Sequence, residues 1–326
     1  MQKILPLPEL RMMPLEELDE RRAVALVTSD PAWQAVKSKL RLRIAWRVDV
    51  TEATAQAWEA QMTDLRGEAI YAVGGGLSVD AAKYMAASKG MELVCIPTAL
   101  SVDAFLTGAS GVRRQGCVRY LETKPPDVLI VDFEVIASAP PSIRAAGICD
   151  VLSIATGRWD WKFAEERDKN PPGMEFIPYI DQAAAAILNG ALDCAEAAGQ
   201  GDPAGLKQLL DCLAIEVQLT NQIGHARPEE GSEHYFAYAV ENLVGHGWLH
   251  AELVCPGILL MARAQGQDTR ALRRAMEACS IQLSSIPERV IEQTLTELPD
   301  YCRAHELPFG IAHVLQPQQI KGLMLG

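Results

Sequence analysis

The sequence lacks the features of a membrane protein and of a protein stabilised by disulfide bonds. No segment reaches the run of about 18 apolar residues that a membrane-spanning helix needs. The N-terminal segment mixes charge and proline early and has no apolar signal-peptide core. The 8 cysteines are scattered singly without a CxxC pair, which argues against a disulfide framework and a cysteine zinc site. We therefore expect a protein of the reducing cytoplasm that does not enter a membrane.

Positive charge is also scarce. The 30 lysines and arginines face 42 acidic residues, for a formal net charge of −12. Binding to nucleic acid or to an anionic membrane surface needs a basic face, so we expect neither partner. A small anionic substrate stays possible, because a local site can be positive on an acidic protein. The 326 residues, 49% of them hydrophobic, allow about two domains with a real core.

The first 140 residues alternate between short apolar runs and helical stretches. Pro31 opens one such stretch, Thr51 is placed to cap a helix over 52–65, and 78–88 is a third. This alternation predicts an α/β domain with a mostly parallel sheet over residues 1–140. The runs predicted as strands are 23–27, 43–48, 69–73, 93–96 and 128–131.

From residue 141 to 326 the pattern becomes helical. Long alanine- and leucine-rich segments cover 180–198, 206–223 and 249–264, with no convincing strand among them. We therefore predict an all-helical C-terminal domain over 141–326, and a ligand cleft between the two domains.

Glycines and polar residues follow two predicted strands. Gly74, Gly75 and Gly76 join a strand to a helix, which is typical of a phosphate-binding turn, although a plain tight turn is an equal alternative. Asp80 and Lys83, taken alone, suggest a solvated pair one helical turn apart. A second group of polar residues follows the end of the next predicted strand. These residues either face a ligand crevice or belong to an ordinary polar loop. That set is Thr98, Ser101, Asp103 and Thr107.

One carboxylate and two imidazoles suggest a metal site. Asp150 is an ionisable group in an otherwise apolar stretch, and buried carboxylates need a partner. His234 follows Ser232, a candidate helix cap, and His250 begins an apolar helix. One oxygen and two nitrogen ligands with an open position suit catalytic Zn²⁺ or divalent iron, although the spacing alone is not diagnostic.

Together these segments resemble the family of metal-dependent dehydrogenases that contains glycerol-1-phosphate dehydrogenase, glycerol dehydrogenase and the iron-containing alcohol dehydrogenases. The resemblance covers about residues 69–265 and fits the glycerol-1-phosphate branch best. It rests on AVGGGLSVDAAK from Ala72, IPTALSVDAFLT from Ile96, GICDVLS from Gly147, GSEH from Gly231 and LHAELV from Leu249.

The resemblance implies an N-terminal Rossmann-like α/β domain followed by an all-helical C-terminal domain, the same division as above, and it assigns residue roles. Asp103 falls where the family contacts the substrate hydroxyl, and we expect it to orient substrate or relay a proton. The NAD(P) site would include Gly75, Gly76, Asp80, Thr98, Ser101 and Thr107. The metal ligands would be Asp150, His234 and His250, with zinc expected rather than iron.

Three positions depart from the family pattern. Tyr238 stands where the glycerol-1-phosphate branch has a substrate-contacting histidine, which leaves the substrate open. Cys149 and Ala251 replace glycines beside metal ligands. His246 is a candidate replacement contact, with an exposed loop histidine as the plainer alternative.

The implied function is NAD(P)-linked interconversion of a small polyol, or polyol phosphate, and its ketone. Asp30, at a strand end, favours NAD weakly over NADP. Two alternatives stay open: a lyase like 3-dehydroquinate synthase that uses bound NAD, and a non-catalytic nucleotide-binding descendant. We also expect a homo-oligomer.

Overall fold

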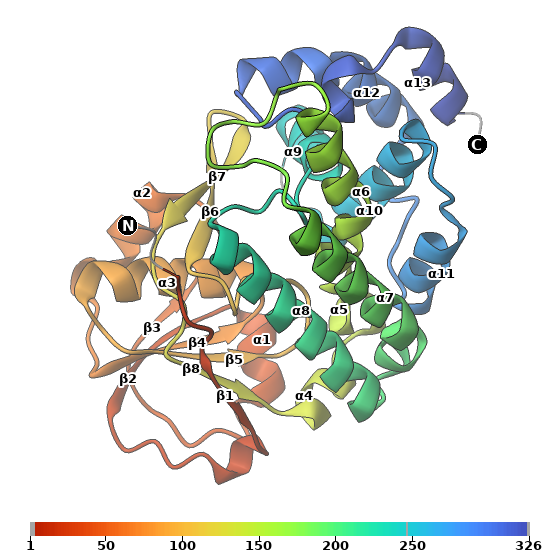
Figure 1. Cartoon of the computed structure of the whole chain (residues 1–326). Coiled ribbons are helices and arrows are strands. Elements are labelled where there is room, and N and C mark those ends of the chain that lie inside the picture. The colour runs from red at the N-terminus through yellow and green to blue at the C-terminus, as the bar shows by residue number, and fades with distance from the viewer. Residues whose placement is uncertain (1–3, 246, 325–326) are drawn as a thin grey trace.

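A computed structural model describes residues 4–245 and 247–324 (Figure 1). Its centre is a parallel sheet of six strands in the order β1-β8-β5-β4-β2-β3. Their bounds are β1 Glu9–Met12, β2 Ala23–Thr28, β3 Arg43–Asp49, β4 Ala69–Gly74, β5 Leu93–Pro97 and β8 Val128–Val131. The predicted parallel sheet is therefore confirmed, with β1 added at one edge, where the sequence predicted no strand.

The inner strands of the sheet are buried because helices cover both faces. The central strands β4 and β5 are buried along their whole length, which explains their continuous apolar runs. Helix α2 starts later than predicted, because Thr54 rather than Thr51 caps it and accepts a hydrogen bond from Ala57 N at 3.2 Å. The helices of this part are α1 Asp30–Val36, α2 Ala55–Gln61 and α3 Gly76–Lys89, with short turns η1 Leu15–Glu17 and η2 Met62–Asp64.

A β-hairpin that the sequence analysis missed projects from the sheet domain toward the helices (Figure 1). Strands β6 (Ala109–Arg114) and β7 (Cys117–Glu122) pair antiparallel around Gln115 and Gly116, which both have positive φ. Two such residues are typical of a tight hairpin turn. Arg113 of the hairpin pairs with Glu241 of α9, with 3.0 Å between Nε and Oε1, which ties the hairpin to the helical part.

The rest of the described chain, from residue 133, is helical, as predicted. One continuous apolar core joins one face of the sheet to these helices, so the two parts share a packed interface. The boundary at residue 140 stays a prediction. The helices are α4 Phe133–Ser138, α5 Pro141–Arg144, α6 Ile148–Glu165, α7 Pro178–Gln200, α8 Pro203–Ile223, α9 Ser232–Val244, α10 His250–Ala264, α11 Arg270–Ala278, α12 Glu288–Ala304, η3 Ile311–Val314 and α13 Pro317–Met324.

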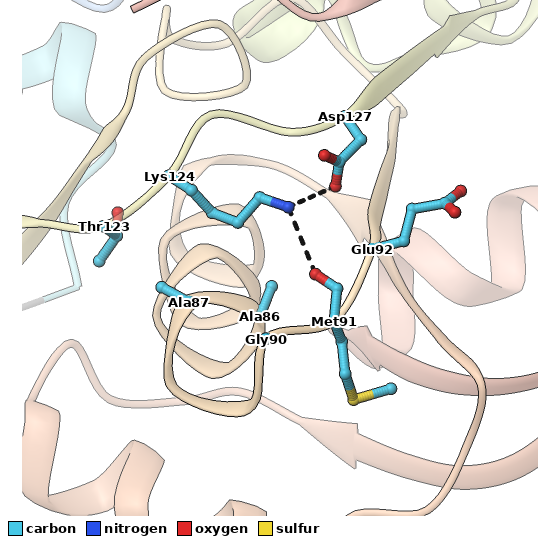
Figure 2. Close-up of a pocket in the computed structure, with 8 residues that line it drawn as sticks. All are labelled: Ala86, Ala87, Gly90, Met91, Glu92, Thr123, Lys124 and Asp127. Atoms are coloured by element: carbon cyan, nitrogen blue, oxygen red, sulfur yellow. Dashed lines mark hydrogen bonds and ion pairs between the residues drawn. The ribbon is translucent and has the colours of Figure 1, made fainter. Parts of the chain in front are cut away.

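Among the helices of residues 4–245 and 247–324, none combines the length and apolarity that a bilayer crossing demands. Figure 2 shows a hollow of about 640 Å³ at the C-terminal end of α3, where Lys124 donates to Asp127 and to the carbonyl of Met91. This hollow lies at the amino ends of β5 and β8. Ligands of parallel sheets bind at the carboxyl ends, so the hollow in Figure 2 is not the candidate catalytic site.

Candidate active site

Three helix starts bring the predicted metal ligands together. Asp150 lies in the first turn of α6, His234 in the first turn of α9, and His250 is the first residue of α10. The Nε2 atom of His250 lies 3.1 Å from Oδ1 of Asp150, and the ring centroids of His234 and His250 are 5.4 Å apart. Residues from three separate helices thus converge at one point of the structure.

The donor set fits a divalent cation. Bonds of about 2.0–2.1 Å at tetrahedral angles place two ligand atoms about 3.3 Å apart, close to the separation of the Asp150 oxygen and the His250 nitrogen. Although burial raises the pKa of Asp150, the charge and hydrogen bond of His250 hold it below its usual value. Asp150 is therefore held ionised, which is the form that binds a metal.

A carboxylate orients His234. Its Nδ1 lies 3.0 Å from Oε1 of Glu233, which is fully buried and also accepts hydrogen bonds from Thr156 and from the backbone of Gly231. Burial lowers the pKa of His234, but the nearby carboxylates outweigh it and raise the pKa to about 9. A histidine that is hydrogen-bonded to a carboxylate through one ring nitrogen offers the other nitrogen to a metal. Metal-binding histidines commonly have such a carboxylate partner.

Cys149 belongs to the tightest donor group beside Asp150. Ligand atoms of Cys149, Asp150 and His250 lie within 4.8 Å of one another, and His234 lies beside this group rather than within it. The Cys149 thiol is buried and donates to Oδ1 of Asp150 at 3.2 Å. Burial raises the pKa of this thiol well above its usual value, so without a bound cation it stays neutral.

Asp103 reaches the same point from the sheet domain. Its backbone N–H donates to Oδ2 of Asp150 at 2.9 Å, so the loop after β5 is fixed to the start of α6. Burial, together with the charge of Asp150, raises the pKa of the half-buried Asp103 carboxyl to about 7. A carboxyl with this pKa can take up or release a proton near neutral pH.

Two further acids face Asp103, and the sequence analysis missed both. Carboxylate oxygens of Asp103, Glu216 and Glu229 lie within 4.8 Å of one another. Glu216 is only 2% exposed, and burial together with Glu229 raises its pKa well above its usual value. A signal was present, because Glu216 interrupts an apolar stretch of α8.

Tyr238, the candidate substrate contact, is buried and held by two partners. Its hydroxyl donates to Oε1 of Glu230 at 2.7 Å and lies 3.1 Å from the hydroxyl of Tyr120 on the missed hairpin. Its ring centroid is 6.1 Å from that of His234. Tyr238 therefore lies next to the metal candidates, where it brings no positive charge.

The predicted cofactor turn meets the loop after β5. Gly74 has φ +139°, a conformation that favours glycine, and it pairs with Pro97 at the carboxyl ends of β4 and β5. A Cβ on Gly75 would lie 3.1 Å from Oγ of Ser101, and Thr98 directly follows β5. The glycine turn, Thr98 and Ser101 thus share one edge of the sheet, at the N-terminus of α3.

The pair of Asp80 and Lys83 is buried, and the expectation of a solvated pair is wrong. Lys83 is 0% exposed, and its Nζ lies 2.9 Å from Oδ1 of Asp80. The same Nζ donates to Oγ1 of Thr107 at 3.0 Å and to the carbonyls of Ala104 and Ala109. The lysine is buried because Asp80 and the loop carbonyls together satisfy its three N–H groups.

Comparison with known proteins places this chain in a family. The family model for iron-containing alcohol dehydrogenases matches residues 11–140. The glycerol-1-phosphate dehydrogenase [NAD(P)+] of Sulfurisphaera tokodaii is 32% identical over 254 residues, which are 77% of this chain and 67% of that protein. The chain belongs to the iron-containing alcohol dehydrogenase family. Its resemblance to that family is therefore confirmed, and with it the prediction of an oxidoreductase.

Solved structures of iron-containing alcohol dehydrogenases and related enzymes share the fold. A probable glycerol dehydrogenase from Sinorhizobium meliloti 1021 superposes with a TM-score of 0.72 at 18% identity, over 98% of this chain and 96% of that one. The 2-epi-5-epi-valiolone synthase of Streptomyces hygroscopicus subsp. jinggangensis 5008, solved with NAD⁺ and Zn²⁺ bound, gives 0.64 at 16% identity, over 98% and 96%. The predicted fold class is confirmed.

In this member of the iron-containing alcohol dehydrogenase family, Asp30 and Ser232 have contacts other than those expected from the sequence. Asp30 is exposed at the start of α1 and pairs with Arg47, with 3.1 Å between Oδ1 and Nη2. Ser232 is the first residue of α9 rather than its cap, and its hydroxyl donates to Asp160. His246, the candidate replacement for a substrate histidine, lies outside the described residues.

Proposed function

We propose that the chain is a metal-dependent, NAD(P)-linked dehydrogenase that interconverts a small polyol and its ketone. The observation that carries the proposal is the 3.1 Å approach of His250 Nε2 to Asp150 Oδ1, with His234 alongside. The relatives named glycerol-1-phosphate dehydrogenase [NAD(P)+] support the cofactor and the substrate class. The loop that carries Asp103 joins this point to the glycine turn, so a metal and a cofactor bound there would lie near each other.

Asp150, His234 and His250 are the proposed metal ligands, and Glu233 orients His234. A divalent cation held there would act as a Lewis acid that makes the substrate hydroxyl more acidic. We propose zinc, because two imidazoles and one carboxylate suit it and because a structural neighbour holds Zn²⁺ beside NAD⁺.

Asp103 is the proposed proton-handling residue. Its pKa of about 7 suits a group that accepts the substrate proton and passes it to solvent. A bound NAD(P)⁺ would supply the acceptor for the hydride of the carbinol carbon, while Asp103 would take up the hydroxyl proton. Tyr238 lines the substrate side, where its hydroxyl is already oriented by Glu230.

The cofactor residues proposed are Gly75, Gly76, Asp80, Thr98, Ser101 and Thr107. Gly75 and Gly76 let the dinucleotide phosphates approach the N-terminus of α3. Asp80 acts through Lys83, which also contacts Thr107 and so fixes the loop beside the turn. A homo-oligomer stays an expectation.

The test is metal analysis of the purified protein together with a screen for NAD(P)H formation at 340 nm. Glycerol, its phosphates and simple polyols are the oxidation substrates, and dihydroxyacetone and its phosphate are the reverse substrates. We expect one bound divalent cation per chain and net NAD(P)H production. Metal-bound protein that makes product without net NAD(P)H would instead indicate a lyase of the dehydroquinate synthase kind.

A further inference from the structure

The acid cluster formed by Asp103, Glu216 and Glu229 contains carboxylate oxygens that are buried without a hydrogen-bond partner. Neither oxygen of Glu216, nor Oε2 of Glu229, has a hydrogen-bond partner within the described part of the chain. Glu216 is only 2% exposed, so water does not solvate its carboxylate freely. Buried carboxyl groups without partners are costly in an unliganded fold, which makes the cluster a place for a bound group.

Two buried basic side chains, Arg227 and Lys83, donate to groups outside the cluster. Arg227, in the same loop as Glu229, donates to the carbonyls of Asp160 and Phe309. Lys83 is occupied by Asp80, Thr107 and two carbonyls. Neither side chain forms an ion pair with the cluster within the described residues, so a bound cationic group would pair with these carboxylates and favour their ionised form.

The cluster adjoins the proposed reacting centre. Asp103 belongs to both, because its backbone N–H donates to Asp150 while its carboxylate faces Glu216 and Glu229. A fourth acid, Glu230, directly follows Glu229 and accepts a hydrogen bond from the hydroxyl of Tyr238. A substrate bound with its carbinol at Asp150 thus meets carboxylates beyond it, and a phosphate dianion there would be repelled.

We propose that these carboxylates bind a primary ammonium group of the substrate, so that the enzyme oxidises an amino polyol in preference to a polyol phosphate. A primary ammonium has three N–H donors, one for each carboxylate. Donor–acceptor distances of about 2.8 Å at tetrahedral angles need acceptors about 4.6 Å apart, which fits oxygens within 4.8 Å of one another.

This inference rests on the proposed dehydrogenase function, and its test separates the two. The metal-loaded protein is assayed at pH 7 with 3-amino-1,2-propanediol, 2-amino-1,3-propanediol, glycerol and sn-glycerol-1-phosphate, and NAD(P)H formation is followed. We expect kcat/KM for an aminopropanediol to exceed that for glycerol by about tenfold or more, since each charged hydrogen bond adds to binding. Equal values, or a preference for the phosphate, would overturn the inference and leave the dehydrogenase function standing.

Two variants and one control identify the residues responsible. Glu216→Gln and Glu229→Gln should each reduce the ratio of amine to glycerol kcat/KM by about tenfold, because the amide carries no charge. Glu288→Gln, a matched change on the exposed start of α12, should leave the ratio unchanged. A loss of equal size for both substrates would show a structural role only and would contradict the proposal.

Calorimetry supplies a readout that does not need turnover. Binding of 3-amino-1,2-propanediol to the metal-loaded protein should be at least about tenfold tighter than binding of glycerol, and Glu216→Gln should remove the difference. If no compound reduces NAD(P) but this difference is measured, the dehydrogenase function fails and the ammonium site stands. Calcium or magnesium that displaces the amine competitively from the cluster would identify an ion site and overturn the inference.

Discussion

Ionisable side chains that are buried distinguish the catalytic end of this molecule from the rest of its surface. Asp150, His234, Glu233 and Glu216 are each less than a tenth exposed, whereas charged residues such as Arg270 and Asp268 form an exposed pair. Exposed pairs contribute little, but buried groups change their protonation with their neighbours. Single-residue changes at this end should therefore alter chemistry more than folding.

His250→Ala should abolish metal retention and turnover while leaving a folded protein. His250 is one-third exposed at the start of α10, so its removal opens no core cavity. Metal content after gel filtration and circular dichroism are the measurements. His305→Ala, at the end of α12, is the control and should keep its metal. Full metal occupancy in His250→Ala would refute the ligand assignment.

Asp103→Asn should reduce kcat by about a hundredfold or more and change the Kd for NAD(P) little, because the amide cannot take up the substrate proton. The backbone N–H that donates to Asp150 is kept, so the loop stays in place. Stopped-flow turnover and fluorescence titration with NAD(P)H measure the two quantities. Equal losses in kcat and cofactor affinity would point to a cofactor-binding role.

At the scale of elements, the site is assembled where strands end and helices begin. The turn between β4 and α3 meets the loop after β5, and the starts of α6, α9 and α10 meet around Asp150. Helix starts expose unpaired N–H groups and carry a partial positive charge, so they suit phosphates and carboxylates. Substitutions in the turn between β4 and α3 should therefore affect cofactor binding, and substitutions at the starts of α6, α9 and α10 should affect metal binding.

Gly75→Ala should raise KM for NAD(P) by about tenfold and leave metal content unchanged, because the added Cβ fills the approach that a phosphate would use. That Cβ would lie 3.1 Å from Oγ of Ser101. Gly322→Ala, in α13, meets nothing within 4 Å and is the matched control. Steady-state kinetics with varied NAD(P) and metal analysis make the test; an unchanged KM would remove the turn from the cofactor site.

Asp160 joins α6 to α9 and η3, and it predicts how stability depends on pH. Its carboxylate accepts hydrogen bonds from Ser232, Gln265 and the backbone of Ile311, yet burial and the charge of Glu233 raise its pKa to about 6. A raised carboxyl pKa means that the folded state binds its proton more tightly. The stabilising contribution is therefore complete below about pH 4 and is lost as pH rises through about 6.

Relative to Asp160→Asn, the wild type should lose up to about 3 kcal/mol of unfolding free energy between pH 4 and pH 7, from a shift of about two pH units. Urea unfolding at the two pH values measures it. Asp193→Asn, an exposed change on α7, should show no such difference from wild type. A pH-independent difference between wild type and Asp160→Asn would contradict the assignment.

For the whole molecule, the proposed metal links three helices that lie far apart in the sequence. Asp150, His234 and His250 come from α6, α9 and α10, which pack on one core continuous with the sheet. A ligand that binds only the folded state stabilises it by mass action. The metal therefore connects global stability to the catalytic site.

Chelation should lower the melting temperature, and Zn²⁺ should restore it. At a free Zn²⁺ concentration of 100 times Kd the gain is about 2.7 kcal/mol, which corresponds to roughly 5 °C or more for a chain of this size. Differential scanning calorimetry with and without chelator measures the shift. His250→Ala should show none, and a shift of equal size in that variant would place the stabilising ion elsewhere.

The sequence by itself determined the local features of this protein. Apolar runs and their spacing predicted most of the sheet strands, because a strand buried on both faces must be apolar along its length. The family motifs identified Asp150, His234 and His250 as a possible ligand set. Short elements such as β1 and the β6–β7 hairpin were not predicted, because their burial depends on partners far along the chain.

Only the tertiary structure decided which charges share a space. Glu216 and Glu229 were invisible as a pair, and Lys83 was wrongly expected to be solvated, because a side chain's burial follows from the packing of distant elements. Electrostatic interactions act through space rather than along the chain, so three carboxylates from three segments became one cluster when the loop after β5, α8 and the segment before α9 packed together.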